Sequence, residues 1–156
     1  MKLSFSTNYW NKNLKDNFID IAKEYKFDGV EIHGLSDIKE FISPDVISDT
    51  YHKMIEHNIK IPCIDITGDI GNESEISEAI KETKEAISVA NKLRIPYLRV
   101  RATENGNEEA VKNYLDTMLP EAEKHNIILL VETFGIYSDT SKLSNLLSSY
   151  ASGYLA

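Results

Sequence analysis

Six ionisable side chains stand at alternate positions within or at the end of short apolar segments, where they could do chemistry. They are Glu31, His33, Asp65, Arg99, Arg101 and Glu132. Carboxylates and a histidine can move protons or bind a divalent cation, and arginines bind the oxygens of carboxylates, phosphates and sugars. Because a charge inside a sheet is costly unless it is paired or bound to a metal, this pattern indicates either an ion-pair network or a functional site.

The segments that carry these residues are predicted strands. Apolar runs with β-branched residues recur about 30 residues apart, which is the length of a strand–helix–strand unit. They span residues 2–7, 29–33, 60–67, 96–102 and 127–134. Between them, apolar residues recur every three or four positions, as on one face of a helix. Parallel strands joined by helices leave two architectures, an open doubly wound sheet or a barrel.

The contents of the strands favour the barrel. A doubly wound sheet has nearly continuous apolar strands and a glycine-rich first turn for phosphate, whereas the segment SFSTNYW (4–10), which includes the end of the first predicted strand, has no glycine. We therefore predict an α/β fold, an incomplete (βα)8 TIM barrel with about five parallel βα units in sequential order. Residues 1–156 are expected to form a single domain, the N-terminal portion of such a barrel.

Alternation places the ionisable residues on one face of the predicted sheet. Val30 and Ile32 oppose Glu31 and His33, and the later strands alternate in the same way. The apolar face suits a ring of outer helices. The charged face then directs the six side chains toward the barrel interior, near the strand ends where barrel enzymes place their active sites.

A purely structural interpretation stays open for part of this set. Glu31, Asp65 and Arg99 could simply neutralise one another as a buried network. Arg101 and Glu132 lie last on their strands, which favours a functional role. Cys63 is most simply a small buried apolar residue.

Composition excludes several classes of function. The net charge of -8 opposes binding to nucleic acid, and no apolar run approaches the roughly 20 residues that span a bilayer. The single cysteine excludes an internal disulfide and a cysteine-based metal site. The N-terminal segment MKLSFSTNYWNKN lacks the hydrophobic stretch of a signal peptide, so we expect a cytoplasmic protein without membrane or nucleic-acid partners.

Four segments resemble, in order and spacing, strands of xylose-isomerase-like TIM barrels. They are DGVEIHG (28–34), IPCIDITGDIG (61–71), LRVRA (98–102) and LLVETFG (129–135). That superfamily contains sugar isomerases and epimerases, enzymes of inositol catabolism and endonuclease IV. The resemblance implies a divalent metal, Mn, Mg, Co or Zn, at the mouth of the barrel. It also implies that Glu132 is both a metal ligand and the catalytic residue.

The resemblance implies roles for the other five residues as well. Arg101 and His33 would contact the oxygens or the phosphate of a small sugar. Glu31 and Asp65 would lie behind them and orient the arginines, with Arg99 in the same supporting set. The remaining metal ligands of the family come from strands six to eight, so we expect this chain alone not to bind the metal tightly.

The end of the chain leads to the functional hypothesis. Residues 139–156 are predicted to form a fifth helix that leads toward a sixth strand, and residues 153–156 then end without a partner. The favoured interpretation is a truncated, metal-dependent isomerase or epimerase of carbohydrate metabolism, inactive alone. One alternative is a non-catalytic half-barrel that forms homo-oligomers through the unpaired edges of its first and fifth strands. Another, disfavoured by the net charge, is an endonuclease IV-like phosphodiesterase.

Overall fold

The computed structural model describes residues 1–8, 14–35, 39 and 42–156, and for residues 14–16 it describes the backbone. Within this part of the chain, one sheet has parallel strands in the order β1-β2-β3-β4-β5. The strands are β1 (Ser4–Ser6), β2 (Gly29–His33), β3 (Cys63–Asp69), β4 (Tyr97–Arg101) and β5 (Ile128–Val131). The predicted sequential order is therefore confirmed, and the chain has the architecture of an incomplete TIM barrel.

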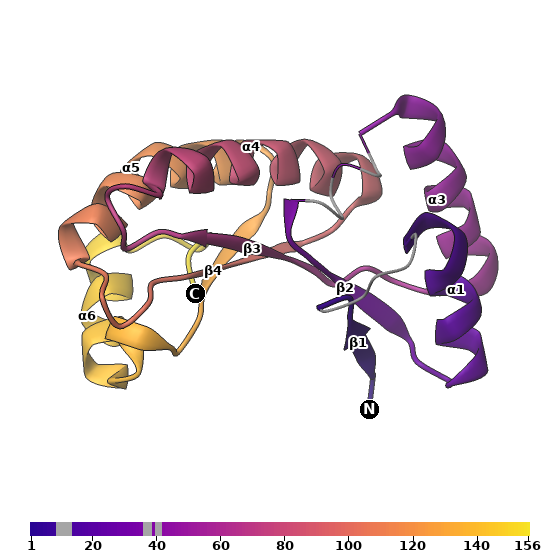
Figure 1. Cartoon of the computed structure of the whole chain (residues 1–156), viewed down its shortest axis with the longest axis horizontal. Helices are drawn as coiled ribbons and strands as arrows, with labels where there is room; N and C mark the ends of the chain where they lie inside the picture. Colours follow the sequence, from indigo (N-terminus) through magenta and orange to yellow (C-terminus); the bar gives the residue numbers. More distant parts are fainter. Residues whose placement is uncertain (9–13, 36–38, 40–41) are drawn as a thin grey trace.

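Helices connect successive strands, as the predicted βα repeat requires. They are α1 (Leu14–Glu24), α3 (Pro44–His57), α4 (Ile76–Leu93), α5 (Glu108–Lys124) and α6 (Thr140–Tyr150), with a short 3-10 helix η1 (Gly135–Tyr137) before α6. Figure 1 shows α4 and α5 along one side of the sheet and α1 beside α3. No helix among the described residues is both long enough and apolar enough to cross a membrane.

Local sequence signals explain where two of these helices begin and end. The Ser43 hydroxyl caps α3 by accepting the Val46 N–H, and Asn107 caps α5 by accepting the Ala110 N–H at 2.7 Å. Asn58 follows α3 in the left-handed conformation, with φ of 53°. Asparagine adopts this conformation more readily than most residues, so the chain can turn back toward β3.

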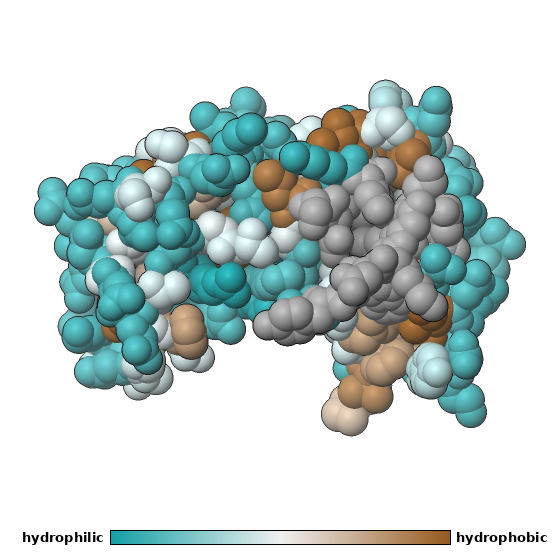
Figure 2. Space-filling model, viewed as in Figure 1, coloured by the Kyte–Doolittle hydropathy of each residue, from teal (hydrophilic) through white to brown (hydrophobic). Residues whose placement is uncertain are grey.

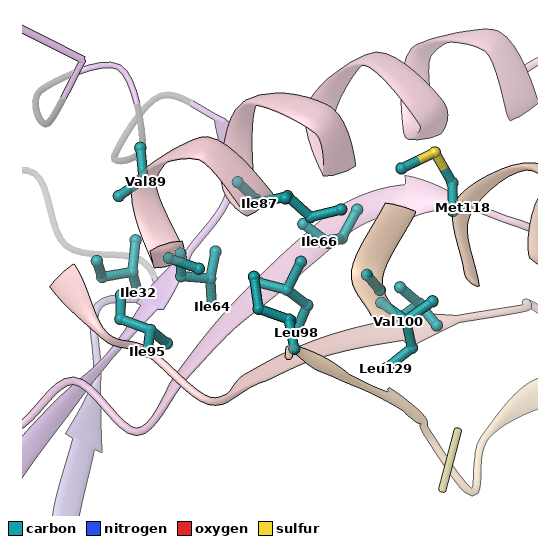
Figure 3. Close-up of a cluster of buried hydrophobic side chains, with 14 of the residues drawn as sticks. Ile32, Ile64, Ile66, Ile87, Val89, Ile95, Leu98, Val100, Met118 and Leu129 are labelled. Carbon is teal, nitrogen blue, oxygen red and sulfur yellow. The ribbon is translucent and has the colours of Figure 1, made fainter. Parts of the chain in front are cut away.

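The core lies between the sheet and the helices. Figure 2 shows a largely hydrophilic surface over α5 and α6. Figure 3 shows a cluster of the buried apolar side chains of the core. Ile64, Ile66 and Leu98 of the sheet lie near Ile87 of α4, and none of the three is exposed. Burying one such side chain stabilises the fold by about 1.5–3 kcal/mol. The apolar face of each strand therefore packs against the helices. The opposite face keeps the ionisable residues.

Strand boundaries differ from the predicted ones at several ends. β1 is shorter than residues 2–7, and β4 is one residue shorter at each end than residues 96–102. β3 begins later and ends later than residues 60–67, at Asp69, because the pairing register with β4 shifts between Asp65 and Asp69. β5 ends at Val131 rather than at residue 134, so Glu132 directly follows the strand.

The last residues of the chain correct one expectation. Leu155 bridges Leu129 in parallel, and the N–H groups of Leu129 and Val131 donate to the carbonyls of Tyr154 and Ala156 at 2.9 and 2.7 Å. Residues 153–156 were expected to lack a partner and the fifth strand to have an unpaired edge. Both expectations were wrong, because the chain turns back after α6 and buries the Leu155 side chain beside β5.

Candidate active site

The inner face of the sheet holds an ion-pair network centred on Arg99. Its Nη2 donates to Glu31 Oε1 at 2.9 Å, and its Nε donates to Asp65 Oδ1 at 3.1 Å. These contacts link β4 to β2 and β3, since the pairing register places Asp65 opposite Arg99. The predicted contact between an acid and an arginine is present. It matches the structural interpretation that the sequence left open for these three residues.

Asp65 also orients His33 on the neighbouring strand. The Asp65 side chain is almost completely buried, and its Oδ2 lies 2.5 Å from His33 Nδ1. The backbone N–H of His33 donates to Thr7 Oγ1 at 2.8 Å. With Nδ1 engaged by the carboxylate, the Nε2 atom is the ring nitrogen that remains for another partner.

Burial and these contacts shift the pKa values of Arg99 and Cys63 at the centre of the network. Burial works to lower the pKa of Arg99, but the hydrogen bond and charge of Asp65 and the charges of Glu31 and Glu132 outweigh it and raise that pKa. Arg99 is therefore a permanent cation. Burial, followed by the charge of Glu31, raises the pKa of the Cys63 thiol to about 12, so Cys63 stays a neutral thiol.

Arg101 lies on the same face as Arg99 but has a different environment. Its Nη2 donates to the carbonyl oxygen of Thr67 at 3.2 Å. It forms no ion pair with any residue in the described part of the chain. Arg101 is a half-buried residue at the C-terminal end of β4.

Glu132 lies beside Arg101 at the end of the next strand. Its backbone N–H donates to the Val100 carbonyl at 2.9 Å, which continues the pairing of β4 with β5. Glu132 is half-buried, and its carboxylate has no hydrogen-bond or ion-pair partner among residues 1–8, 14–35, 39 and 42–156. A carboxylate without a direct hydrogen-bond or ion-pair partner is available for proton transfer or for a ligand.

Two buried acids that shape this site were missed by the sequence reasoning. Glu82 of α4, only 2% exposed, accepts hydrogen bonds from the N–H and hydroxyl of Thr67 and from the N–H of Gly68. Nothing in the periodicity of α4 distinguishes Glu82 from a surface acid. Asp69 accepts the Thr103 hydroxyl at 2.5 Å and the N–H of Gly71. Strand alternation, which puts Asp69 in phase with Asp65, was a signal that could have identified it.

The residues of this site do not by themselves fit a divalent metal. Nowhere in the described ranges do three or more His, Cys, Asp or Glu side chains form a group that could hold one. Arg99 neutralises Glu31 and Asp65, and Glu132 makes no direct ion pair with it. A hard cation takes about six donors, and a single free carboxylate supplies only one or two of them.

Comparison with protein families defines the class of protein. The model of the family described as xylose isomerase-like TIM barrel matches residues 19–147, which is most of the chain. The chain therefore belongs to the xylose isomerase-like TIM barrel family. A search of curated protein sequences finds no match.

Solved structures share the fold. The probable 3-DHS dehydratase AsbF from Bacillus anthracis is 17% identical with a TM-score of 0.75, and the match covers 99% of this chain and 61% of AsbF. The IolI protein, solved with a zinc atom, is 19% identical with a TM-score of 0.77, covering 100% of this chain and 61% of IolI. The 3-keto-D-glucoside 4-epimerase YcjR from E. coli is 15% identical with a TM-score of 0.67, covering 84% of this chain and 55% of YcjR. The chain thus spans about three fifths of the length of these proteins.

Proposed function

We propose that this chain is the N-terminal part of a divalent-metal-dependent isomerase or epimerase that acts on a sugar, a sugar phosphate or an inositol, and that it is inactive alone. The observation that carries the proposal is the unpartnered carboxylate of Glu132 at the C-terminal end of the sheet, beside the unpaired guanidinium of Arg101. Family membership and the fold shared with an epimerase support it. A cytoplasmic location, without membrane or nucleic-acid partners, is part of the same proposal.

In this proposal each inner residue has a chemical task. Glu132 takes a proton from the hydroxyl-bearing carbon next to a carbonyl group and returns it to the carbonyl carbon, while the hydroxyl proton passes to the former carbonyl oxygen. Arg101 stabilises the negative charge that develops on the substrate oxygen. His33 contacts a sugar hydroxyl through Nε2. Arg99, fixed by two carboxylates, holds the strands that position these groups in a constant arrangement.

The proposed inactivity of the isolated chain follows from the small number of side chains that could serve as metal ligands. Among the inner carboxylates in the described residues, Glu132 makes no hydrogen bond or ion pair, whereas Arg99 engages Glu31 and Asp65, and Thr103 holds Asp69. The solved IolI protein holds a zinc atom and is longer than this chain. In the proposal, the other metal ligands therefore come from outside residues 1–156.

Calorimetric titration with Mn²⁺ tests this proposal. The chain should bind Mn²⁺ as weakly as an acidic surface does, and Glu132→Gln should change that binding no more than Glu104→Gln, a control in the exposed turn after β4. Adding a fragment that carries the sixth to eighth βα units should create tight binding and isomerase activity. Glu132→Gln should then abolish both, while Glu104→Gln should not. Tight stoichiometric binding by the chain alone, lost in Glu132→Gln, would instead show a site assembled between two copies.

A second candidate function is a non-catalytic half-barrel that self-associates. The inner face presents Tyr97, which is 37% exposed, and Phe134 beyond β5 is 45% exposed. Exposed aromatic residues on an open sheet face favour contact with another surface. The pairing of residues 154–156 with β5 weakens this candidate, since it covers part of one edge that self-association would use.

A further inference from the structure

We infer that Glu82 of α4 is a positioning residue of the proposed active site. It fixes the direction of the Arg101 guanidinium through the peptide group that joins Thr67 to Gly68. The inference rests on the proposed function, which gives Arg101 a task in the reaction, and it adds to the site a residue from outside the sheet. It starts from an irregularity near the end of β3.

The pairing of β3 with β4 is interrupted between Asp65 and Asp69. These two residues pair with Arg99 and Arg101, so β3 is longer than β4 between the two pairs. Residues 66–68 have no paired residue on β2 or β4 in the described part of the chain. A bulge of this kind leaves backbone N–H groups without partners in the sheet, and buried N–H groups need a replacement.

The carboxylate of Glu82 supplies that replacement. Its Oε2 accepts the N–H groups of Thr67 and Gly68 and the Thr67 hydroxyl, each at 3.1 Å. Glu82 is 2% exposed, and these donors compensate its carboxylate for the loss of water. Glycine at position 68 allows the close approach, since a Cβ there would lie 2.8 Å from the Ala79 Cα. The bulge is therefore fixed to α4.

The fixed bulge presents the Thr67 carbonyl oxygen to Arg101. Arg101 Nη2 donates to this oxygen at 3.2 Å. The Thr67 C=O and the Gly68 N–H belong to one planar peptide group, in which they point in opposite directions. The bond from the Gly68 N–H to Glu82 on one side therefore sets the direction of the carbonyl on the other, and with it the direction of the guanidinium.

The inner acids do not hold Arg101 in the described part of the chain. Two of them form the ion pairs of Arg99. Asp69 lies opposite Arg101 in the register but accepts the N–H and the hydroxyl of Thr103 instead. A guanidinium held by a neutral carbonyl keeps its full charge, and a donor fixed in advance needs no reorganisation during a reaction. This is the advantage that Glu82 gives the site.

Chemical modification of arginine tests the inference. Phenylglyoxal reacts with guanidinium groups, and mass spectrometry of peptides follows the rate at Arg94, Arg99 and Arg101 separately. Glu82→Ala should raise the rate at Arg101 about fivefold, the factor that corresponds to one ordinary hydrogen bond. The rates at the other two arginines should not change, because other contacts hold them. Glu82→Gln keeps the shape and an acceptor oxygen, so it should restore most of the protection.

Thr83→Val is the matched control. Thr83 is the next residue of α4 and is fully buried, and its hydroxyl forms a hydrogen bond with the Tyr114 hydroxyl at 2.7 Å. Its replacement removes a buried hydrogen bond from the same helix without touching the bulge, so the rate at Arg101 should not change. Circular dichroism and urea unfolding establish that each variant is folded. Thr67→Val removes one bond to Glu82 and keeps the carbonyl, so it should give a smaller rise at Arg101.

Three outcomes would overturn the inference. One is an unchanged rate at Arg101 in folded Glu82→Ala, and another is an equal rise in Thr83→Val, which would show a general loosening of α4. If Glu82→Ala does not fold, an unchanged rate at Arg101 in Thr67→Val is the third. The measurement uses no substrate and no metal, so each of these results leaves the isomerase proposal standing. That proposal fails separately, when the completed chain shows no metal binding that depends on Glu132.

Discussion

Arg99 and Arg101 lie on the same face of β4, but they contact different partners. Arg99 joins β2, β3 and β4 through two acids, and Asp65 in turn engages His33. Removing one member of such a set leaves the others charged and poorly solvated, so the network is worth more in stability than any one contact indicates. Arg101 forms no ion pair in the described part of the chain and makes one hydrogen bond, to the Thr67 carbonyl oxygen.

Arg99→Met should therefore destabilise the chain. Asp65 is 1% exposed and would lose its guanidinium partner, as would Glu31. We expect a loss of about 3 kcal/mol in the free energy of unfolding, at the low end for a broken buried pair because Arg99 is 31% exposed. Urea unfolding followed by circular dichroism measures it. Arg94→Met, which removes a cation–π contact with Tyr51, is the control and should cost about 1 kcal/mol or less. Equal losses in the two variants would argue against the network.

Elements of this fold are held in place by contacts that lie far apart in the sequence. α4 anchors the end of β3 through Glu82, and the last residues of the chain cover part of β5. The second contact gives β5 a backbone partner on the side away from β4. It also places the apolar side chain of Leu155 in the core.

Leu155→Ala tests whether this terminal pairing stabilises the fold. Leu155 is buried against β5, so its truncation should lower the free energy of unfolding by about 2 kcal/mol. Leu3→Ala is the matched control, because Leu3 is 48% exposed and should lose much less. Thermal and urea unfolding measure both. If the two variants are equally stable, residues 154–156 do not hold β5.

The described part of the molecule is an open parallel sheet with helices packed on its apolar face. β1 is one edge of the sheet, and residues 154–156 extend the other edge beyond β5. The apolar residues Met1 and Leu3 are exposed around the N-terminus, where Figure 2 shows an apolar patch. An open barrel of this kind leaves surface that a closed barrel covers.

We therefore predict that the isolated chain self-associates. Sedimentation and light scattering should give an apparent mass that rises with protein concentration. Tyr97→Lys should weaken the association by placing a charge on the inner face, next to the paired Arg99. Tyr25→Lys, at an exposed position after α1, should leave it unchanged. A compact monomer at all concentrations would contradict the prediction.

Much of this architecture follows from local patterns in the sequence. The alternation of Val30 and Ile32 with Glu31 and His33 specifies which side of β2 faces the helices, because side-chain direction along a strand depends on neighbours alone. The alternation of strand and helix segments specifies parallel pairing, because each helix returns the chain to the end of the sheet at which the previous strand began. The shared face of Glu31, Asp65 and Arg99, which contact one another, was predictable for the same reason.

The tertiary structure alone decided how those residues are paired. The register shift that sets Asp69 opposite Arg101, the reach of Glu82 to Thr67, and the bridge between Leu155 and Leu129 depend on contacts between separate elements. No local pattern encodes them, because each depends on where a strand stops and on which side chain fills the space beside it. In the described residues, Arg99 is thereby paired with two acids of the protein, whereas Arg101 and Glu132 form no ion pair.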